Sequence, residues 1–471
     1  MSAALWLPDE TTAAVQGAAS GALAPAYGVS IDSRSLQKGD LFVALITPNA
    51  DGHAHVAAAL QNGAAAAIVS RRPDGLADDA ALILVDDTQA ALERLGQAAR
   101  NRSTARIAAV TGSVGKTSTK EMLAAALGGQ GATHWSAASY NNQWGVPLSL
   151  ARMPRETRWG VFELGMNHSG EIAILTRQAR PDVAIVTTVE AAHLEFFSGI
   201  EEIADAKAEI FLGVPATGAA ILNADNPMHD RLAAAAKAAG VGRILSFGAA
   251  EGADIRLIGI EPDATGSAVE ADILGTRIAY RLGQPGRHLV MNSLAVLGAA
   301  ELLGADLALA AQALGVLQGL AGRGRQQVIA VGDGEAVLID ESYNASPASM
   351  RAAFAVLAAS QPLGRRIAIL GDMRELGTQG PALHAGLADP LVAAGVDLVY
   401  TAGPLMRHLH DALPARMQGA WRPSAAELLP RLIDGLRPGD VITIKGSLGS
   451  RMADIVKPLM AGAAAASRIA S

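Results

Sequence analysis

The residues best suited to chemistry form a glycine-rich segment between a predicted strand and a predicted helix. An apolar run at residues 107–110 is followed by Gly112-Ser113-Val114-Gly115-Lys116-Thr117-Ser118, and the Lys-Thr pair begins the helix. In such a loop, backbone N–H groups converge on phosphate oxygens at the helix N-terminus. Lys116 would reach the β- and γ-phosphates, and the Thr117 hydroxyl would bind Mg²⁺. The segment predicts a nucleoside triphosphate site with Mg²⁺; the alternative is a glycine turn followed by a surface lysine.

This loop is shorter than the full Walker A pattern, which has a glycine where this chain has Val110. The Asn-Lys-x-Asp motif by which regulatory GTPases read guanine does not occur in the sequence. Segment 159–165 carries Glu163 at the end of a predicted strand, where motor and transporter ATPases usually have Asp. A carboxylate there suits Mg²⁺, which prefers oxygen ligands. It could instead cap the loop that follows.

A second group of polar residues lies in an apolar context further along the chain. His193 follows a buried strand, at the edge where open α/β sheets bind ligands. Lys207 lies in a predicted helix rich in small residues, near Asp205 and Glu209. Taken singly, such a histidine is usually structural and such a lysine usually lies on a solvated face. Together with the phosphate loop and Glu163, both favour a shared catalytic site.

These side chains need a scaffold of parallel strands. Helical segments alternate with apolar runs of strand length at residues 107–110, 159–164, 183–189, 220–223 and 244–247. This alternation predicts a parallel sheet covered by helices on both faces. Residues 254–282 alternate between apolar and polar side chains instead, which predicts an antiparallel extension of that sheet.

Two further series of strands and helices flank the central one. The first has expected strands at residues 42–46, 66–69 and 82–85 and an Ala-rich helix at 55–62. The last has expected strands at residues 336–340, 367–370, 398–400 and 441–444. At about 150 residues per domain, a chain of 471 residues also corresponds to three domains. We therefore expect an α/β protein with domains at residues 1–103, 104–322 and 323–471.

Composition excludes several classes of protein. The chain has no cysteine, which excludes disulfides, a thiol nucleophile and thiolate metal sites. Its formal net charge of −7 argues against a nucleic-acid binder, which usually has a basic domain. The first residues lack the positive charge of a signal peptide, and no apolar run reaches the length of about 18 residues that a membrane span needs. We expect a cytoplasmic protein with no integral membrane association.

The order of these groups resembles that of the Mur ligases, the ATP-dependent amino-acid ligases of peptidoglycan synthesis. The likeness spans nearly the whole chain and includes Asp32-Ser33-Arg34, Asn141-Asn142 with the following Gly-Val-Pro-Leu, and the segments at residues 342–347 and 371–377. It implies a central P-loop-type ATPase domain with a parallel sheet. An N-terminal UDP-sugar-binding α/β domain and a C-terminal Rossmann-like α/β domain would flank it.

The resemblance implies catalytic roles for Lys116, Glu163, His193 and Lys207. Lys207 matches a lysine that is carbamylated in these ligases, which turns a cation into an oxygen ligand. Glu163 and His193 match residues of the metal site. Two Mg²⁺ ions are therefore expected, with Thr117, Glu163, His193 and the carbamylated Lys207 around them.

The resemblance also implies contacts with ATP outside the phosphate loop. Asn292 matches an asparagine near the adenine, and Arg323 matches an arginine that reaches the phosphates from a domain junction. The acidic residue that binds the ribose falls at Asp340 or Glu341, and Glu341 gives the better match.

The motifs are most similar to those of the last ligase of the pathway, which adds D-alanyl-D-alanine to UDP-N-acetylmuramoyl-tripeptide (UDP-MurNAc-tripeptide) through an acyl phosphate. The Asp-Asn-Pro-Arg motif of the preceding ligase is absent from the third domain. Ser346 stands where the family more usually has Asn. The alternatives are a sibling ligase that adds a diamino acid, or a P-loop ATPase that is not a ligase. We expect a monomer whose substrate contacts come from Ser33, Arg34, Asn141, Asn142, Asn344, Asp372 and Arg374.

Overall fold

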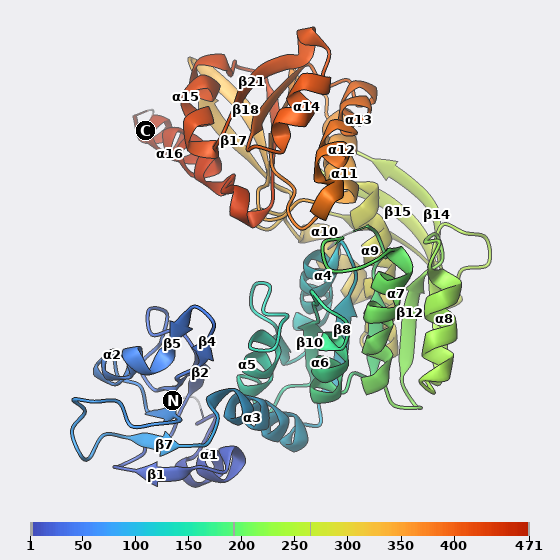
Figure 1. Cartoon of the computed structure of the whole chain (residues 1–471). Helices are drawn as coiled ribbons and strands as arrows, with labels where there is room; N and C mark the ends of the chain where they lie inside the picture. The colour runs from blue at the N-terminus through green and yellow to red at the C-terminus, as the bar shows by residue number, and fades with distance from the viewer. Residues whose placement is uncertain (1–2, 192–193, 264, 470–471) are drawn as a thin grey trace.

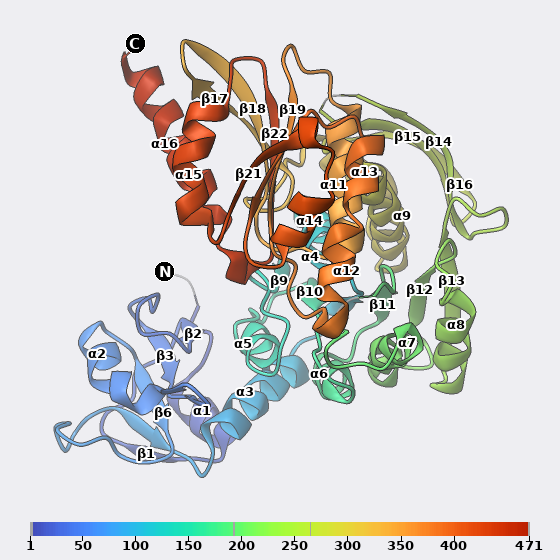
Figure 2. The same ribbon diagram turned by 45° about the horizontal axis from the view of Figure 1, so that its top comes forward.

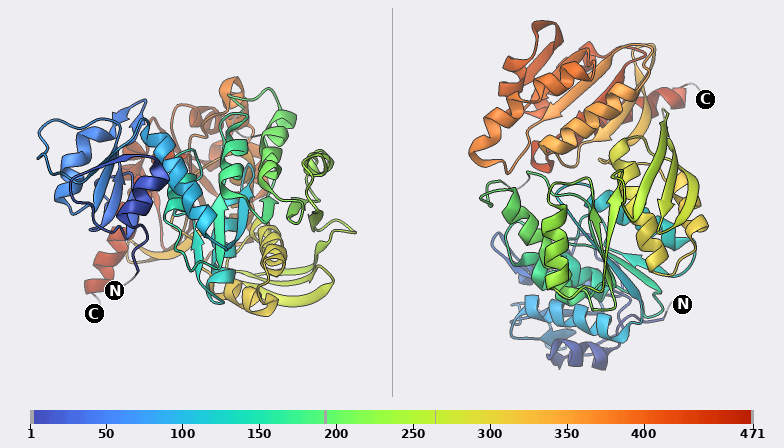
Figure 3. Two further views of the ribbon diagram at one scale, coloured as in Figure 1. Left: turned by 90° about the horizontal axis from the view of Figure 1, so that it is seen from below. Right: turned by 90° about the vertical axis from the view of Figure 1, so that its right-hand side faces the viewer.

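The chain forms three lobes in the computed structural model, which describes residues 3–191, 194–263 and 265–469 (Figure 1). Each lobe is built on its own sheet. The N-terminal lobe lies at one end of the central lobe, and the C-terminal lobe packs over a different side of it (Figures 2 and 3). Within the described residues, no helix is both long enough and apolar enough to cross a membrane.

The first lobe has a mostly parallel sheet. Its strands lie in the order β1 (Ala18–Ser20), β7 (Leu82–Leu84), β6 (Ala66–Val69), β3 (Asp40–Val43) and β2 (Gly28–Ser30), with only β1 antiparallel. A small hairpin of β4 (Ile46–Thr47) and β5 (Ala50–Asp51) follows β3. The helix expected at residues 55–62 is a 3₁₀ turn, η1 (Gly52–His55), followed by α2 (Val56–Gln61). Helix α1 (Pro8–Val15) completes the lobe.

Helix α3 (Thr88–Arg102) joins this lobe to the central one. It begins at Asp87, whose side chain accepts a hydrogen bond of 2.7 Å from the backbone N–H of Gln89, a typical N-cap. Its buried residues share one core with Leu148 and Ala151 of α5 (Gly145–Ala151), a helix of the central lobe. The two lobes are therefore joined by continuous apolar packing.

The central lobe contains the large parallel sheet predicted from the sequence. Its strands lie in the order β16 (Thr276–Leu282), β15 (Ser267–Ile273), β14 (Ile255–Pro262), β13 (Arg243–Gly248), β12 (Ala219–Asn223), β11 (Val183–Val186), β8 (Arg106–Thr111), β10 (Trp159–Glu163) and β9 (Thr133–Trp135). From β9 to β14 the pairing is parallel, and β14–β15–β16 is antiparallel. The antiparallel extension expected at residues 254–282 is confirmed.

Successive side chains of β8 point to opposite faces of the sheet and are buried in two different cores. Ala108 and Val110 face the core formed with α4 (Lys116–Gly128), α9 (Arg287–Leu302) and α10 (Leu307–Val316). Ile107 and Ala109 face the core formed with α5, α6 (Glu171–Ala179), α7 (Ile200–Ala208) and α8 (His229–Ala238). This period of two explains why the strand is apolar throughout, as expected for a parallel strand covered on both faces. The helix predicted around Lys207 ends at Ala208 and continues as a 3₁₀ turn, η2 (Glu209–Gly213).

The third lobe repeats this three-layer design. Its strands lie in the order β17 (Arg325–Val331), β18 (Gly334–Glu341), β22 (Val441–Lys445), β19 (Arg366–Gly371), β20 (Leu398–Ala402) and β21 (Gln418–Arg422), with only β17 antiparallel. One face carries α11 (Pro347–Ala359), α12 (Gly380–Ala385), α13 (Ala388–Ala393) and α14 (Met406–Ala412). The other carries α15 (Ala425–Gly435) and α16 (Ala453–Ile469).

In both parallel sheets, the helices that follow two neighbouring strands lie on opposite faces of the sheet. After β8 the chain enters α4 on one face, whereas after β10 and β11 it enters α6 and α7 on the other. After β18 it enters α11 on one face, whereas after β22 it enters α16 on the other. Such switch points leave a crevice at the carboxyl ends of the strands, where α/β proteins bind ligands.

Burial on the central sheet predicts the effect of a core truncation. Phe162 on β10 is fully buried, and Phe162→Ala should lower the free energy of unfolding by about 3–5 kcal/mol because it leaves a cavity. Leu363→Ala is the control, since Leu363 is 99% exposed and its loss should change stability by no more than about 0.5 kcal/mol. Thermal unfolding of both variants beside the wild type is the measurement. Equal midpoints for the two variants would contradict the described core.

Candidate active site

A cavity of about 770 Å³ lies between the central and third lobes. Its wall on the central lobe includes the phosphate loop after β8, Glu163 at the end of β10 and Asn223 at the end of β12. Its wall on the third lobe includes Glu341 at the end of β18 and Lys445 at the end of β22. The carboxyl ends of the two sheets thus face the same space.

The phosphate loop lies in this cavity and takes the backbone form that its glycines permit. Gly112 and Gly115 have φ values of +146° and +88°, where side chains are disfavoured. A Cβ at Gly112 would lie 1.9 Å from Thr187 Oγ1, and one at Gly115 would lie 2.8 Å from Asn292 Nδ2. Both positions therefore need glycine for conformation and for space.

Hydrogen bonds from the segment after β11 hold the loop in place. The backbone N–H of Ser113 donates to the carbonyl of Thr188 at 2.8 Å, so it is already engaged. Thr187 Oγ1 donates to the carbonyl of Val114 at 2.5 Å, and Ser113 Oγ donates to that of Glu190 at 3.0 Å. The N–H groups that begin α4 lack acceptors within the helix. They remain the natural donors to a phosphate.

Glu163 is tied directly to the phosphate loop. Its side chain accepts a 2.7 Å hydrogen bond from Thr117 Oγ1 and a 2.7 Å bond from Asn141 Nδ2. Glu163 is 1% exposed, yet it lines the cavity. A hydroxyl and a carboxylate at the start of α4 provide the oxygen ligands that Mg²⁺ prefers. This pair fits the predicted metal position.

The two lysines expected near the phosphates differ in their surroundings. Lys116 donates from Nζ to the carbonyl of Gly112 at 2.6 Å. Burial lowers the pKa of Lys116, an effect that Glu163 opposes. Lys207 is 1% exposed, and its Nζ lies 3.7 Å from the Sδ atom of Met166. Met166 belongs to the cavity wall. Burial, together with the charge of Lys116, lowers the pKa of Lys207 well below its usual range, which favours a neutral amine.

Arg323 reaches the cavity from the segment that joins the central and third lobes. Its guanidinium lies 4.2 Å from the centre of the Tyr343 ring, and Nη2 donates to Ser139 Oγ at 3.2 Å. Ser139 Oγ lies 3.4 Å from Thr117 Oγ1. The arginine thus approaches the same phosphate-loop hydroxyl that Glu163 contacts.

Asp340 and Glu341 are the two candidates for the ribose, and the fold gives them different surroundings. The carboxylate of Asp340 accepts bonds from the backbone N–H groups of Gly322 (2.7 Å) and Ser342 (3.1 Å) and from Ser342 Oγ (2.6 Å). Asp340 does not line the cavity, and its bond to Gly322 fixes the residue before Arg323. Glu341 lines the cavity and pairs with Lys445.

Most of the predicted site residues lie together. The predicted residues that line the cavity are Ser113, Val114, Gly115, Lys116, Thr117, Ser118, Asn141, Asn142, Glu163, Asn292, Arg323, Glu341 and Asn344. Gly112 and Lys207 lie directly behind this wall through their contacts with Lys116 and Met166. His193 lies outside the residues that the structure describes.

The other predicted substrate residues lie away from this cavity. Arg34 pairs with Asp32 on the exposed surface of the first lobe, and Ser33 lies between them. Asp372 accepts a 2.8 Å bond from the backbone N–H of Met406, and burial raises its pKa. Arg374 donates to the carbonyl of Gly449 at 2.9 Å.

Sequence reasoning missed two lysines, one in the wall of this site and one that supports it. Lys445 ends an apolar strand, as Glu163 does, and that position could have identified it. Lys120 is fully buried one turn after Lys116 and donates to the carbonyls of Ser136 (2.7 Å) and Ala138 (2.5 Å). It thereby holds the loop that carries Ser139, but nothing in the local sequence indicated this.

Comparisons with known proteins agree with this geometry. Three family models match the chain in succession: "Mur ligase family, catalytic domain" at residues 25–102, "Mur ligase middle domain" at 110–300, and "Mur ligase, glutamate ligase domain" at 324–448. The UDP-N-acetylmuramoyl-tripeptide–D-alanyl-D-alanine ligase of Escherichia coli (strain K12) is 36% identical over 96% of this chain and 97% of its own length. The chain belongs to the Mur ligase family. The resemblance found in the sequence is therefore confirmed.

Other Mur ligases extend the likeness. The enzyme of the same name from Rickettsia prowazekii is 35% identical over 91% of this chain and 94% of its own length. The crystal structure of MurF from Acinetobacter baumannii shares 31% identity at a TM-score of 0.84, covering 97% of this chain and 98% of that one. MurF from Thermotoga maritima in complex with ADP shares 26% identity at a TM-score of 0.76, covering 92% and 97%. The predicted three-domain α/β fold of this Mur ligase is confirmed.

The packing of Gly115 against Asn292 predicts that Gly115→Ala weakens nucleotide binding. The new Cβ would clash with the Asn292 amide in a backbone conformation that disfavours side chains, so affinity for ADP should fall about tenfold or more. Gly240→Ala is the matched control, because Gly240 has φ +80° and a Cβ at that position would meet nothing within 4 Å. Calorimetric titration with ADP gives both affinities. Similar losses in the two variants would show that backbone strain alone, away from the loop, accounts for the effect.

Proposed function

We propose that this chain joins D-alanyl-D-alanine to UDP-MurNAc-tripeptide while ATP is converted to ADP and phosphate. The observation that carries the proposal is the phosphate loop facing Arg323 and Glu341 across one cavity. It is supported by the names of the curated relatives, which the chain matches over more than nine-tenths of its length. The UDP-linked tripeptide, the nucleotide and the dipeptide would each bind to a different lobe.

The nucleotide would bind with its phosphates on the loop from Gly112 to Thr117. Lys116 would exchange its bond to the Gly112 carbonyl for bonds to the β- and γ-phosphates. Asn292 would lie near the adenine. Thr117 and Glu163 would hold Mg²⁺, which neutralises phosphate charge when bound. Arg323 would neutralise further charge on the transferred phosphoryl group.

Lys207 suits carbamylation better than a role as a cation. A neutral amine can attack CO₂ and release one proton, which gives a carbamate with two oxygen atoms. The buried position of Lys207 favours the neutral amine that this reaction needs. The carbamate would add oxygen ligands for a second Mg²⁺, a metal role that the family resemblance also gives to His193.

The reaction would proceed in two displacements. The terminal carboxylate of the tripeptide attacks the γ-phosphoryl group, so that an acyl phosphate forms and ADP leaves. The amine of D-alanyl-D-alanine then attacks the acyl carbon, and phosphate leaves as the amide forms. Neither step needs a covalent bond to the protein, which is consistent with the absence of cysteine. Catalysis would rest on positioning and on neutralising charge.

The outer lobes would supply the remaining substrate contacts. We assign the UDP-linked tripeptide to residues 1–103 through Ser33 and Arg34, with Asn141 and Asn142 at the junction. ATP would occupy residues 104–322. The dipeptide would bind to residues 323–471 near Asn344, Asp372 and Arg374, the last two lying at the carboxyl end of β19.

A substrate screen tests this proposal. With UDP-MurNAc-tripeptide, ATP and Mg²⁺, phosphate release should require D-alanyl-D-alanine and yield the UDP-linked pentapeptide by mass spectrometry. Both forms of the tripeptide, with L-lysine or meso-diaminopimelate as third residue, should be offered. Lys116→Met should abolish product. A sibling ligase would instead add a free diamino acid to the UDP-linked dipeptide, and a P-loop ATPase that is not a ligase would release phosphate equally without any amine.

A second experiment tests the role of Lys207. Lys207→Met should lower kcat on the order of 100-fold or more, because the ligand oxygens are lost while an apolar chain of similar length fills the space. Lys237→Met is the control, since Lys237 lies exposed on α8. In isotope-labelled bicarbonate, the wild type and the control should give a carbamate carbon signal by NMR that Lys207→Met lacks. A wild type without that signal, at full activity, would contradict the assignment.

A further inference from the structure

Two charged residues meet where the third-lobe sheet switches faces. Glu341 ends β18 and Lys445 ends β22, and they are direct partners in the parallel register of these strands. The chain leaves β18 for α11 on one face and leaves β22 for α16 on the other. The crevice of this sheet therefore opens between Glu341 and Lys445, and both residues line the cavity.

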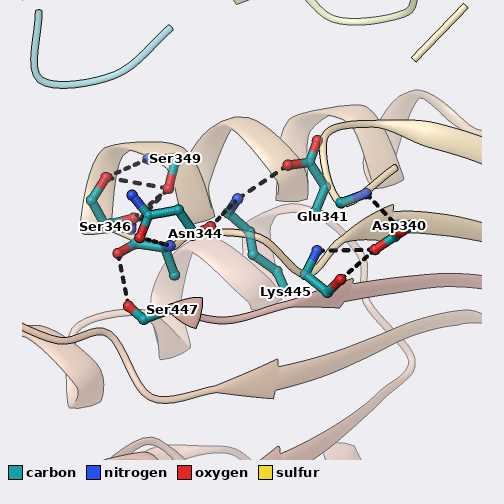
Figure 4. Close-up of polar contacts among 10 residues, drawn as sticks. Asp340, Glu341, Asn344, Ser346, Ser349, Lys445 and Ser447 are labelled. Atoms are coloured by element: carbon teal, nitrogen blue, oxygen red, sulfur yellow. Dashed lines mark hydrogen bonds and ion pairs between the residues drawn. The ribbon is translucent and has the colours of Figure 1, made fainter. Parts of the chain in front are cut away.

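Among the residues that the structure describes, Lys445 forms hydrogen bonds only within this lobe. It is 3% exposed, and its Nζ donates to Glu341 Oε2 at 3.1 Å and to the carbonyl of Asn344 at 3.0 Å (Figure 4). A buried ammonium is costly unless its donors are satisfied, and these two bonds satisfy most of them. The same side chain thus fixes the carboxylate of Glu341 and the backbone of the loop that follows β18.

Neighbouring polar groups stiffen this loop. Ser346 begins α11 with a reciprocal capping box, in which its N–H donates to Ser349 Oγ at 2.9 Å. Ser447 Oγ, just beyond Lys445, donates to the carbonyl of Ala345 at 3.4 Å. Figure 4 shows these contacts around the Lys445 side chain. Lys445 therefore sits in a firmly supported segment, which a residue that positions another one requires.

The carboxylate of Glu341 keeps one oxygen for a ligand. Oε2 accepts from Lys445, whereas no described residue donates a hydrogen bond to Oε1. Asp340, on the preceding position of the strand, has its carboxylate occupied by Gly322 and Ser342. Of these two acidic residues, Glu341 is the one that can accept a hydrogen bond from a ligand hydroxyl in the cavity.

We propose that Lys445 is a positioning residue for the nucleotide sugar. It holds Glu341 so that the free carboxylate oxygen accepts a hydrogen bond from a ribose hydroxyl of the bound nucleotide. Without the lysine, the three side-chain torsions of Glu341 would be free, and ordering them would weaken that bond. Lys445 thereby sets the preference for ribonucleotides over deoxyribonucleotides. This inference rests on the proposed ATP site but assigns a residue that the proposal does not use.

The test compares ATP with 2′-deoxy-ATP and 3′-deoxy-ATP in the complete ligation assay. The wild type should prefer ATP over at least one analogue by about tenfold or more in kcat/KM, as expected for a hydrogen bond to a charged group. Lys445→Met should reduce that preference to about threefold or less, mainly through KM for ATP. Lys445→Arg, which keeps a donor and a charge, should retain more of the preference than Lys445→Met does.

A double-mutant cycle separates positioning from a general loss of structure. Glu341→Gln should also lose ribose preference, and adding Lys445→Met to it should cause no further loss, since the lysine acts through the glutamate. Lys457→Met on the exposed face of α16 is the control and should keep the wild-type preference. Thermal unfolding of every variant verifies folding; if Lys445→Met does not fold, Lys445→Gln carries the same comparison.

The outcomes distinguish this inference from the proposed function. An equal loss of kcat/KM for ATP and both analogues in Lys445→Met would overturn the positioning role. Additive effects of Glu341→Gln and Lys445→Met on the ribose preference would overturn it as well. A wild type that ligates D-alanyl-D-alanine without any ribose preference would also overturn it, with the proposed function intact. Absence of ligation with every nucleotide would instead refute the proposed function.

Discussion

A parallel sheet presents its ligand-binding loops along one edge only, and the cavity of this Mur ligase depends on two such edges facing each other. The central sheet contributes the phosphate loop and Glu163 from its carboxyl edge, and the third sheet contributes Glu341 and Lys445 from its own. Each edge contains a switch point where the covering helices change faces. Asp340 fixes Gly322 in the segment that joins the two lobes, and the next residue, Arg323, contacts Ser139 of the central lobe and Tyr343 of the third.

Four lysines near this cavity differ in their hydrogen-bond partners, and these partners suit them to different roles. Lys120 and Lys445 donate to carbonyl or carboxylate oxygens inside their own lobes and therefore hold the backbone or a side chain in place. Lys116 donates to a single loop carbonyl that a phosphate can replace. Lys207 has only a thioether sulfur as a polar contact among the described residues, and burial favours its neutral amine. The number of oxygen partners, more than the depth of burial, separates these roles.

The sequence predicted those features of the fold and the site that are encoded by residues close together in the chain. The phosphate loop, Glu163 and most strands of the central sheet could be found because glycines, a strand end and apolar runs are visible within a few residues. The short edge strand β9 was not predicted. The choice between Asp340 and Glu341 could not be made from periodicity, since neighbouring strand residues point to opposite sides and only the packed lobe shows which side faces the cavity. Lys445 escaped because its role requires β22 to lie beside β18, about a hundred residues earlier in the chain. Strand β17 was missed because it begins Arg325-Gln-Gln at a sheet edge, where polar residues are common.

Helix α5 belongs to two structural units at once. Its residues Leu148 and Ala151 complete the core of the first lobe, and Trp6 of that lobe donates to the Ala151 carbonyl at 2.9 Å. Just before the helix, Asn141 donates to Glu163 beside the phosphate loop. A ligand on the first lobe that shifts this helix together with the loop before it would also shift Asn141, a partner of Glu163. By thermodynamic linkage, the resulting change in nucleotide affinity would equal the change that the nucleotide causes in the affinity of that ligand. The total binding free energy of the first-lobe ligand and the nucleotide would then be the same whichever of the two binds first.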